Sequence, residues 1–206
     1  IKPEDVTTYE SLADPKLKGK VCSRSGAHPY NLSLVASLIA HDGEAKTEAW
    51  AKAVVANFAR PPKGGDTDQI KSVAAGECGV AVSNTYYLAR LIRSEKIEDR
   101  RMMERVGIVW PNQGDRGTHI NISGAGVVKT SKHPELAVRF LEYLASDEAQ
   151  RYFAEGNNEW PAVAGVVTSN PALDAMGKFK ADSLPVGTLA RQVVAAQKLL
   201  DRAGYR

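Results

Sequence analysis

The sequence predicts an α/β protein in which an open parallel sheet is covered by helices on both faces. Short apolar runs of strand type, such as "KVCSR" and "CGVAV", alternate with segments whose apolar residues recur at helical spacing. This alternation indicates parallel βαβ units. The composition, 43% apolar and 25% charged, is ordinary for a soluble globular protein.

The first half of the chain carries most of this alternation. A short helix and a Pro/Gly turn are predicted at 8–20. Gly43 ends one helix and Pro61 follows the next, because neither residue continues a helix easily. The predicted strands are 20–24, 78–84 and 107–110, and the predicted helices are 31–43, 47–59, 68–77, 85–95 and 98–106.

The pattern changes after "PNQGDRG", at residues 111–117. One or two strands are predicted at 118–130, where the Gly-rich "ISGAG" favours a bend between strands over a phosphate-binding loop. The rest is predicted as helices at 133–145 and 147–156, an irregular segment at 157–166 and a long helix at 186–205.

Composition and charge narrow the choice of partners. The net charge is +3, and the 27 basic residues are scattered instead of forming a basic block. Nucleic acid and anionic membranes are therefore not favoured. No apolar run approaches the roughly 20 residues that span a bilayer. The sequence shows no signal peptide and begins at Ile1 instead of Met, which indicates a processed or truncated product.

The first strand-to-helix turn, in "RSGAHPYN", has the features of an anion pocket. Ser25, Gly26 and Ala27 precede a predicted helix, where free backbone N–H groups and the helix dipole favour an anion. A second turn, "SNTYYL", follows the next predicted strand. In a doubly wound sheet both turns open at the same edge, so their side chains are expected to converge.

Three tyrosines accompany these turns: Tyr30 after the first, and the adjacent Tyr86 and Tyr87 in the second. Phenolate oxygens are hard anionic donors, a bound cation can remove the phenol proton, and tyrosine is an iron ligand in proteins. Fe³⁺ fits this donor set better than softer metals, which prefer Cys or His. The competing interpretation is that the tyrosines are half-buried packing residues with satisfied hydroxyls.

Other polar groups carry weaker signals. Cys22 and Cys78 each adjoin a predicted strand, and they would be free buried thiols in the cytosol or a disulfide in an exported protein. No CxxC or neighbouring His completes a metal site with them. A third sheet-edge turn has three residues that could line a cleft, Asp66, Thr67 and Gln69, while His28 is expected to serve the loop or face solvent.

Four stretches together resemble the periplasmic ferric-ion-binding proteins of bacterial ABC importers: "RSGAHPYNLSLVASLIAHDG", "GGDTDQIKSVAAGEC", "SNTYYLARL" and "NISGAGVVKTSKHPELAVRFLEYLASDEAQ". The resemblance runs along essentially the whole chain. It implies a type II periplasmic-binding-protein fold, export to the periplasm, a Cys22–Cys78 disulfide and delivery of iron to an inner-membrane ABC permease.

The resemblance also implies roles for the residues at the two turns. The dityrosine matches Tyr86 and Tyr87 as Fe³⁺ ligands, and a three-tyrosine subgroup adds a phenolate that matches Tyr30. A synergistic anion such as carbonate or phosphate is expected to contact the small residues and the asparagine before the pair, namely Ser25, Gly26, Ala27 and Asn84.

The chain departs from this family in length. Family members are longer at the N-terminus, where most of their first lobe and further ligands are found. The resemblance assigns residues 1–116 and 168–206 to the second lobe, and 117–167 to a crossing segment that completes the first. Full closure over iron is therefore expected to need the missing lobe or a neighbouring chain.

Two alternatives stay open. The same fold could bind an organic anion or phosphate, with the tyrosines as hydrogen-bond donors. An enzyme could use a cleft tyrosine as acid or base. A short-chain dehydrogenase would have Tyr-x-x-x-Lys, but Arg90 and Leu91 stand four residues after Tyr86 and Tyr87, and no glycine fingerprint is found. A non-enzymatic binding protein is therefore favoured.

Overall fold

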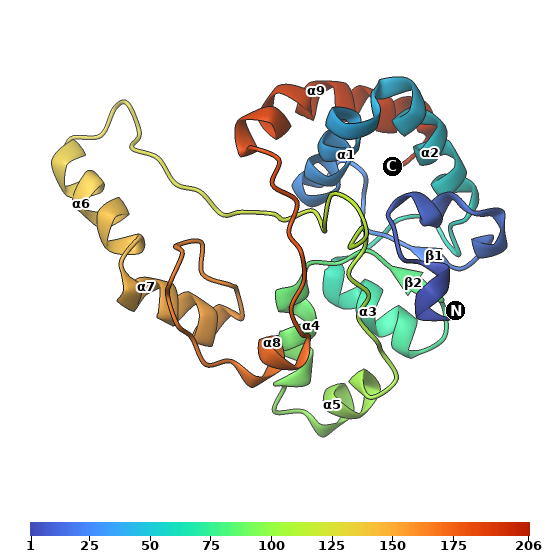
Figure 1. Ribbon diagram of the computed structural model, residues 1–206, viewed down its shortest axis with the longest axis horizontal. Helices are drawn as coiled ribbons and strands as arrows, with labels where there is room; N and C mark the ends of the chain where they lie inside the picture. Colours follow the sequence, from blue (N-terminus) through green and yellow to red (C-terminus); the bar gives the residue numbers. More distant parts are fainter.

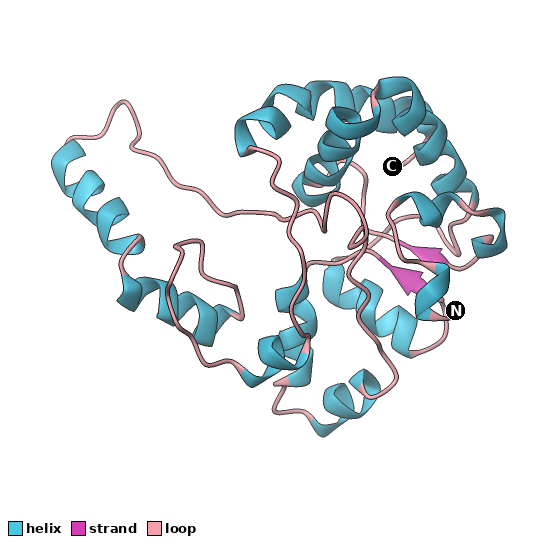
Figure 2. Cartoon of the chain, viewed as in Figure 1, coloured by secondary structure: helices cyan, strands magenta, loops and turns pink.

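Two short parallel strands lie at the centre of the protein. In the computed structural model, which describes residues 1–206, β1 (Val21–Cys22) pairs with β2 (Val80–Ala81), so that Val21 lies opposite Val80. Helices lie on both sides of this pair (Figures 1 and 2). The predicted fold class, an α/β protein with a parallel sheet between helices, is confirmed. None of the helices combines the length and apolar character that a membrane span requires.

One helical layer joins distant parts of the chain. Helices α1 (Pro29–Asp42) and α2 (Glu44–Ala56) pack against α9 (Val186–Ala203) (Figure 1). Gly43 separates α1 from α2 with a φ of 82°, a conformation that glycine adopts without steric cost. The buried side chains of this layer include Val35, Ala36, Val54, Leu199 and Leu200. Their burial fixes α1, whose N-terminus carries Tyr30, against the sheet.

The other layer carries the second turn. It consists of α3 (Asp66–Ala74), α4 (Thr85–Ile92), α5 (Ile97–Met103) and the short α8 (Pro171–Ala175), which sequence patterning did not predict. Ile70, Ala74, Leu91 and Met103 form one buried cluster, and Ala89, Ala172, Leu173 and Met176 form another. Helix α4 belongs to both clusters, so its first turn is held firmly.

The N-terminal segment is less regular than predicted. The expected helix at 8–20 is a pair of 3₁₀ turns, η2 (Glu10–Ala13) and η3 (Pro15–Leu17), preceded by η1 (Pro3–Asp5). A disulfide joins Cys22 to Cys78 with 5.8 Å between their Cα atoms. The predicted bond between the two neighbouring strands is confirmed.

Two predicted strand regions were wrong. Residues 107–110 pair with no strand. Trp110 instead stacks on Phe179 at 4.2 Å between ring centroids, and its indole N–H donates to the Met176 carbonyl. Residues 118–130 pair only through Thr118, which bridges Ala181 in parallel. Residues 120–130 are exposed and pair with no strand.

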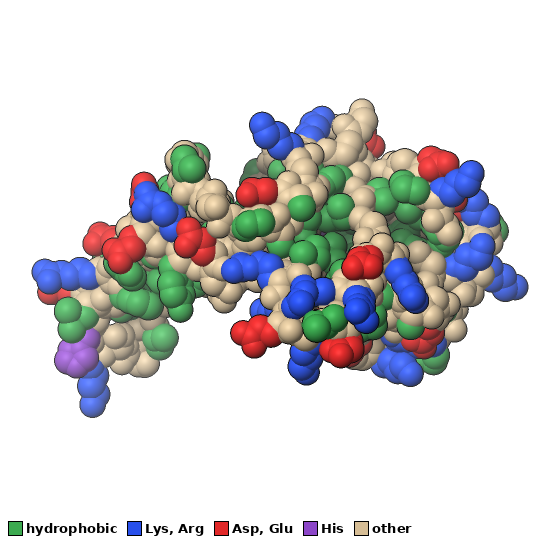
Figure 3. Space-filling model, turned by 90° about the horizontal axis from the view of Figure 1, so that it is seen from below, with side chains coloured by type: hydrophobic (Ala, Val, Ile, Leu, Met, Phe, Trp, Pro, Cys, Tyr) green, Lys and Arg blue, Asp and Glu red, His purple; other side chains and the backbone are tan.

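The segment after this bridge forms an arm that projects from the body (Figure 1). It contains α6 (Pro134–Leu144), α7 (Asp147–Tyr152) and a π-helical turn, η4 (Phe153–Asn157). Helix α6 has no buried residue, and its apolar side chains Leu136 and Phe140 are 60% and 59% exposed. Apolar side chains are therefore visible on the surface of the arm (Figure 3). The irregular character predicted for 157–166 is confirmed.

Candidate functional site

The three tyrosines predicted from the two turns come together. His28 is the N-cap of α1 and places Tyr30 in the first helical turn, while Asn84 is the N-cap of α4 and places Tyr86 and Tyr87. The hydroxyls of Tyr30 and Tyr86 lie 2.6 Å apart. The rings of Tyr86 and Tyr87 have centroids 4.4 Å apart. Two strand-to-helix turns thus direct three phenols to one place.

The three hydroxyls influence one another's ionisation. Burial and hydrogen bonds with the other two tyrosines raise the pKa of Tyr86. A hydrogen bond with Tyr86 lowers the pKa of Tyr30, but burial and the Tyr87 hydroxyl outweigh it and the net pKa is raised. Burial opposes ionisation of Tyr87 as well, yet hydrogen bonds from Tyr86 and Tyr30 lower its pKa overall. The three phenols therefore do not ionise independently of one another.

The small-residue turn before α1 lies beside this cluster. Ser25 and Ala27 bond to each other, with the Ala27 N–H 3.3 Å from the Ser25 Oγ. Gly26 is buried, and a Cβ at this position would lie 2.2 Å from the carbonyl oxygen of Tyr205. The absence of a side chain at Gly26 thus has a packing reason that is independent of any ligand.

Residues that sequence patterns did not reveal hold this turn in place. The Tyr205 hydroxyl lies 2.5 Å from the Ser23 Oγ. The Asn31 side-chain amide donates to the carbonyls of Arg24 at 3.1 Å and Ser25 at 3.0 Å. Tyr205 and Asn31 are both buried, so the turn is fixed from behind by side chains far apart in sequence.

A buried ion pair connects the turns. The Arg24 guanidinium donates to Asp66 Oδ1 at 2.8 Å, and the Asn84 backbone N–H donates to Asp66 Oδ2 at 2.9 Å. The Arg24 Cζ also lies 4.9 Å from the centre of the Tyr30 ring, in cation–π range. Asp66 was one of three residues predicted to line a cleft from the third turn. Arg24 was missed, although it directly precedes the small-residue turn.

The two companions of Asp66 do not share its contacts. Gln69 is fully buried and bonds to Arg60 and to the Lys63 carbonyl. Thr67 is half-buried. On the tyrosine side, the Asn84 amide is 3.5 Å from the Tyr86 hydroxyl, and Asn121 donates to Asn84 Oδ1 at 3.0 Å. Asn121 thus links the 118–130 segment to the site.

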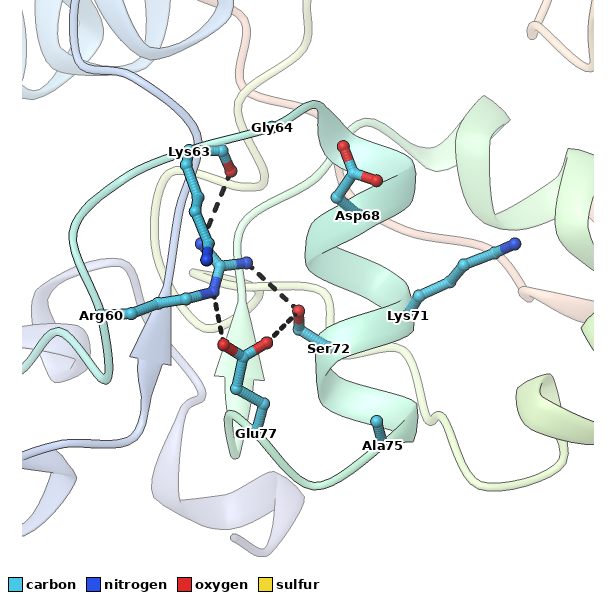
Figure 4. A pocket seen from close by; sticks show the side chains of 8 residues that line it. All are labelled: Arg60, Lys63, Gly64, Asp68, Lys71, Ser72, Ala75 and Glu77. Carbon is cyan, nitrogen blue, oxygen red and sulfur yellow. Dashed lines mark hydrogen bonds and ion pairs between the residues drawn. The ribbon is translucent and has the colours of Figure 1, made fainter.

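A surface hollow of about 440 Å³ lies apart from the tyrosines, over α3 (Figure 4). Its lining includes Arg60, Lys63, Ser72 and Glu77. Arg60 pairs with Glu77 at 2.9 Å, and the Ser72 hydroxyl donates to Glu77 at 2.6 Å. Arg60 and Glu77 thus form an ion pair within the hollow. The protein contains no group of three or more His, Cys, Asp or Glu side chains placed to hold a metal ion.

The histidines stand outside the phenol cluster. The ring of His28 contacts Tyr30 with 4.3 Å between centroids, and its Nδ1 accepts the Tyr30 backbone N–H at 3.3 Å. Burial, followed by the charge of Arg24, lowers the pKa of His28. These contacts agree with the expected structural role of His28 at the helix N-terminus.

In open α/β sheets, ligands bind at the carboxyl ends of the strands, where the three phenols lie. The chain belongs to the family of bacterial extracellular solute-binding proteins, whose sequence profile matches residues 3–181. The type II periplasmic-binding-protein fold is confirmed by solved structures.

Several relatives are named for iron uptake or ferric iron binding. Iron uptake protein A1 of Synechocystis sp. is 48% identical over 206 residues, which are 100% of this chain and 57% of the relative. A ferric binding protein from Campylobacter jejuni superposes with a TM-score of 0.96 at 41% identity, over 100% of this chain and 65% of that one. A Trichodesmium protein solved with iron and citrate ligands superposes with a TM-score of 0.94 at 51% identity, with the same coverage.

The chain thus spans 57–65% of the length of these relatives. They are named as iron uptake or ferric binding proteins and not as enzymes, which confirms the predicted non-enzymatic class.

Proposed function

We propose that this protein binds ferric iron through the phenolate oxygens of Tyr30, Tyr86 and Tyr87. The observation that carries the proposal is the convergence of three phenols from two separate turns, with 2.6 Å between the Tyr30 and Tyr86 hydroxyls. Three hydroxyls in one place are costly to bury unless they share hydrogen bonds or a cation. Hard anionic oxygens suit Fe³⁺, and no cluster of softer ligands competes for it.

In this proposal the protein works in the periplasm and delivers iron to an ABC importer. Support comes from the family and from relatives named for iron uptake and periplasmic ferric binding. Coordination positions that the three phenolates leave open would be filled by the region that the longer relatives have in addition, a neighbouring chain, water, or an anion such as carbonate or phosphate.

Titration of the iron-free protein with ferric citrate tests the proposal directly. Phenolate-to-iron charge transfer should give the protein a visible colour. A double variant, Tyr86→Phe with Tyr87→Phe, should stay colourless while keeping its fold. Tyr152→Phe is the matched control, because Tyr152 lies on the arm and is 71% exposed.

The same titration separates the alternatives. A binder of an organic anion or phosphate would stay colourless with ferric citrate in every variant. A colourless parent, both as this chain and in a longer form that includes the region its relatives have in addition, would reject ferric iron as the cargo.

A further inference from the structure

The carboxylate of Asp66 accepts the backbone N–H of Asn84, one of the four residues that were expected to contact an external anion. It lies between the two turns and is 1% exposed. One of its oxygens accepts from the Arg24 guanidinium at 2.8 Å, and the other accepts from the Asn84 backbone N–H at 2.9 Å. These are the kinds of donor that bind a carbonate or phosphate ion: a guanidinium and a backbone N–H at the start of a helix.

We propose that Asp66 serves as a built-in anion, so that this site takes up ferric iron without recruiting phosphate or carbonate at the small-residue turn. The inference rests on the proposed iron function, which it refines by naming what stands in place of a synergistic anion.

The arrangement of Arg24 supports this assignment. Its side chain is 15% exposed and lies over the Tyr30 ring at 4.9 Å. Asp66 is the acid that pairs with it. A guanidinium placed there without Asp66 would be a buried charge in need of an anion from solvent. Because Asp66 supplies that anion, an external anion would have to displace a buried carboxylate. The displacement would break one hydrogen bond from the Arg24 guanidinium and one from the Asn84 backbone N–H.

The turn itself leaves little for an external ion. The Ala27 N–H is directed to the Ser25 Oγ, and the His28 N–H donates to the Ser25 carbonyl at 3.1 Å. The Tyr205 carbonyl lies on the Cβ side of Gly26. Two backbone N–H groups of the predicted anion cradle, those of Ala27 and His28, are therefore engaged within the protein.

The first experiment uses inorganic phosphate and the iron-free protein, so that its result does not depend on iron. Calorimetric titration should show no phosphate binding to the parent. Asp66→Asn removes the built-in charge and should show measurable phosphate binding, because the Arg24 guanidinium then lacks its anionic partner. Asp68→Asn is the matched control, because Asp68 lies on the same helix but is exposed and bonds to the Gly65 N–H.

A second experiment measures iron. Ferric citrate uptake by the parent should be the same with and without added phosphate, whereas uptake by Asp66→Asn should depend on it. Iron uptake by Arg24→Lys should depend on added phosphate less than uptake by Asp66→Asn does, since lysine keeps the positive charge but loses the planar fork of the guanidinium. Arg24→Gln combined with Asp66→Asn should bind no phosphate, because both members of the pair are removed.

Each outcome bears on the inference separately from the iron proposal. Phosphate binding by the parent that disappears in Arg24→Gln would overturn the built-in anion even if the parent turns coloured with iron. A colourless parent that nevertheless excludes phosphate would reject the iron proposal and keep the assignment of Asp66. If Asp66→Asn does not fold, the parent titrations alone decide.

Discussion

The hydroxyl oxygens of Tyr30 and Tyr86 lie 2.6 Å apart, although the two residues are separated by 56 positions in the chain. Each stands in the first turn of a helix that follows a strand of the same parallel pair. The contact therefore depends on the sheet, which brings both helix N-termini to one edge. Changes at these residues should act on binding while leaving the packing of α1 and α4 largely intact.

Tyr86→Phe and Tyr87→Phe should each weaken ferric iron binding far more than they change stability. The substitution removes an anionic oxygen and keeps the ring, so a loss of at least about tenfold in affinity is expected, one metal–ligand contact being worth more than an ordinary hydrogen bond. Competition against citrate gives the affinity and thermal unfolding gives the stability. Parent-like iron affinity in either variant would remove that residue from the ligand set.

Tyr30→Phe should have a milder effect on affinity than either change in the pair. Tyr30 reaches the cluster from the other turn, and its hydroxyl bonds to Tyr86. Losing one of three phenolates should also weaken the charge-transfer band per bound iron. The visible spectrum of the iron-loaded variant checks this, and an unaltered band would show that Tyr30 is not a ligand.

Iron capture should release protons and weaken as the pH falls. The pKa values of Tyr30 and Tyr86 are raised above the ordinary value, so the iron-free protein holds these protons at neutral pH and must give them up to bind. Each phenol that ionises should lower affinity by about tenfold for each pH unit of acidification. Indicator dyes measure the released protons, and competition with citrate at neutral and mildly acidic pH measures affinity. An affinity that is independent of pH would argue against phenolate ligands.

Acid also acts on the fold, which requires a control for that experiment. Burial lowers the pKa of His119 to about 4, and its Nε2 lies 2.9 Å from the Ser33 hydroxyl. The neutral imidazole is favoured in the folded state, so its contribution to stability is lost as the pH falls below the ordinary value of about 6.5. Circular dichroism at each pH separates this loss from the loss of iron.

Reduction of the Cys22–Cys78 disulfide should destabilise the protein by about 4 kcal/mol in the chain-entropy view, given the 56-residue separation. Both cysteines are buried, so reduction should be slow in the native state. Denaturant unfolding with and without reductant measures the effect. Titration of the unfolded, unreduced protein should find no free thiol, and finding two would rule the bond out.

Phe140→Ser should leave the free energy of unfolding of this chain within about 0.5 kcal/mol of the parent, because the side chain is 59% exposed on α6. Leu199→Ala, in the buried core, should cost about 2–5 kcal/mol. In a longer protein that contains the first lobe, the Phe140 change should become costly if 117–167 belongs to that lobe. Equal effects in both forms would contradict the proposed division of the chain.

Sequence periodicity predicted the helices well, because α1, α2 and α9 each bury an apolar face and are bounded by Gly or Pro. The convergence of the two turns was also predictable, because the helices that follow parallel strands begin at the same edge of the sheet. The helices of the arm were also predicted, but not their exposure, since periodicity indicates a helix and an apolar face without indicating what covers that face.

Long-range contacts account for what was missed. Residues 107–110 have a strand-like pattern, but Trp110 stacks on Phe179 instead, and no local signal encodes that choice. Arg24 and Asp66 are 42 positions apart, so their pairing appears only in three dimensions. The same holds for Tyr205, whose carbonyl explains Gly26 without a ligand.

The contact between Tyr205 and Ser23 spans 182 positions, which has a consequence for the order in which the molecule matures. Contacts so distant along the chain form slowly, since a long loop must close before they contribute. The turn that leads into Tyr30 is completed only after Tyr205 has been synthesised and α9 has docked. A nascent or partly folded chain would therefore lack a defined iron site, and the colour of bound iron would report completed folding of the whole α1–α9 layer.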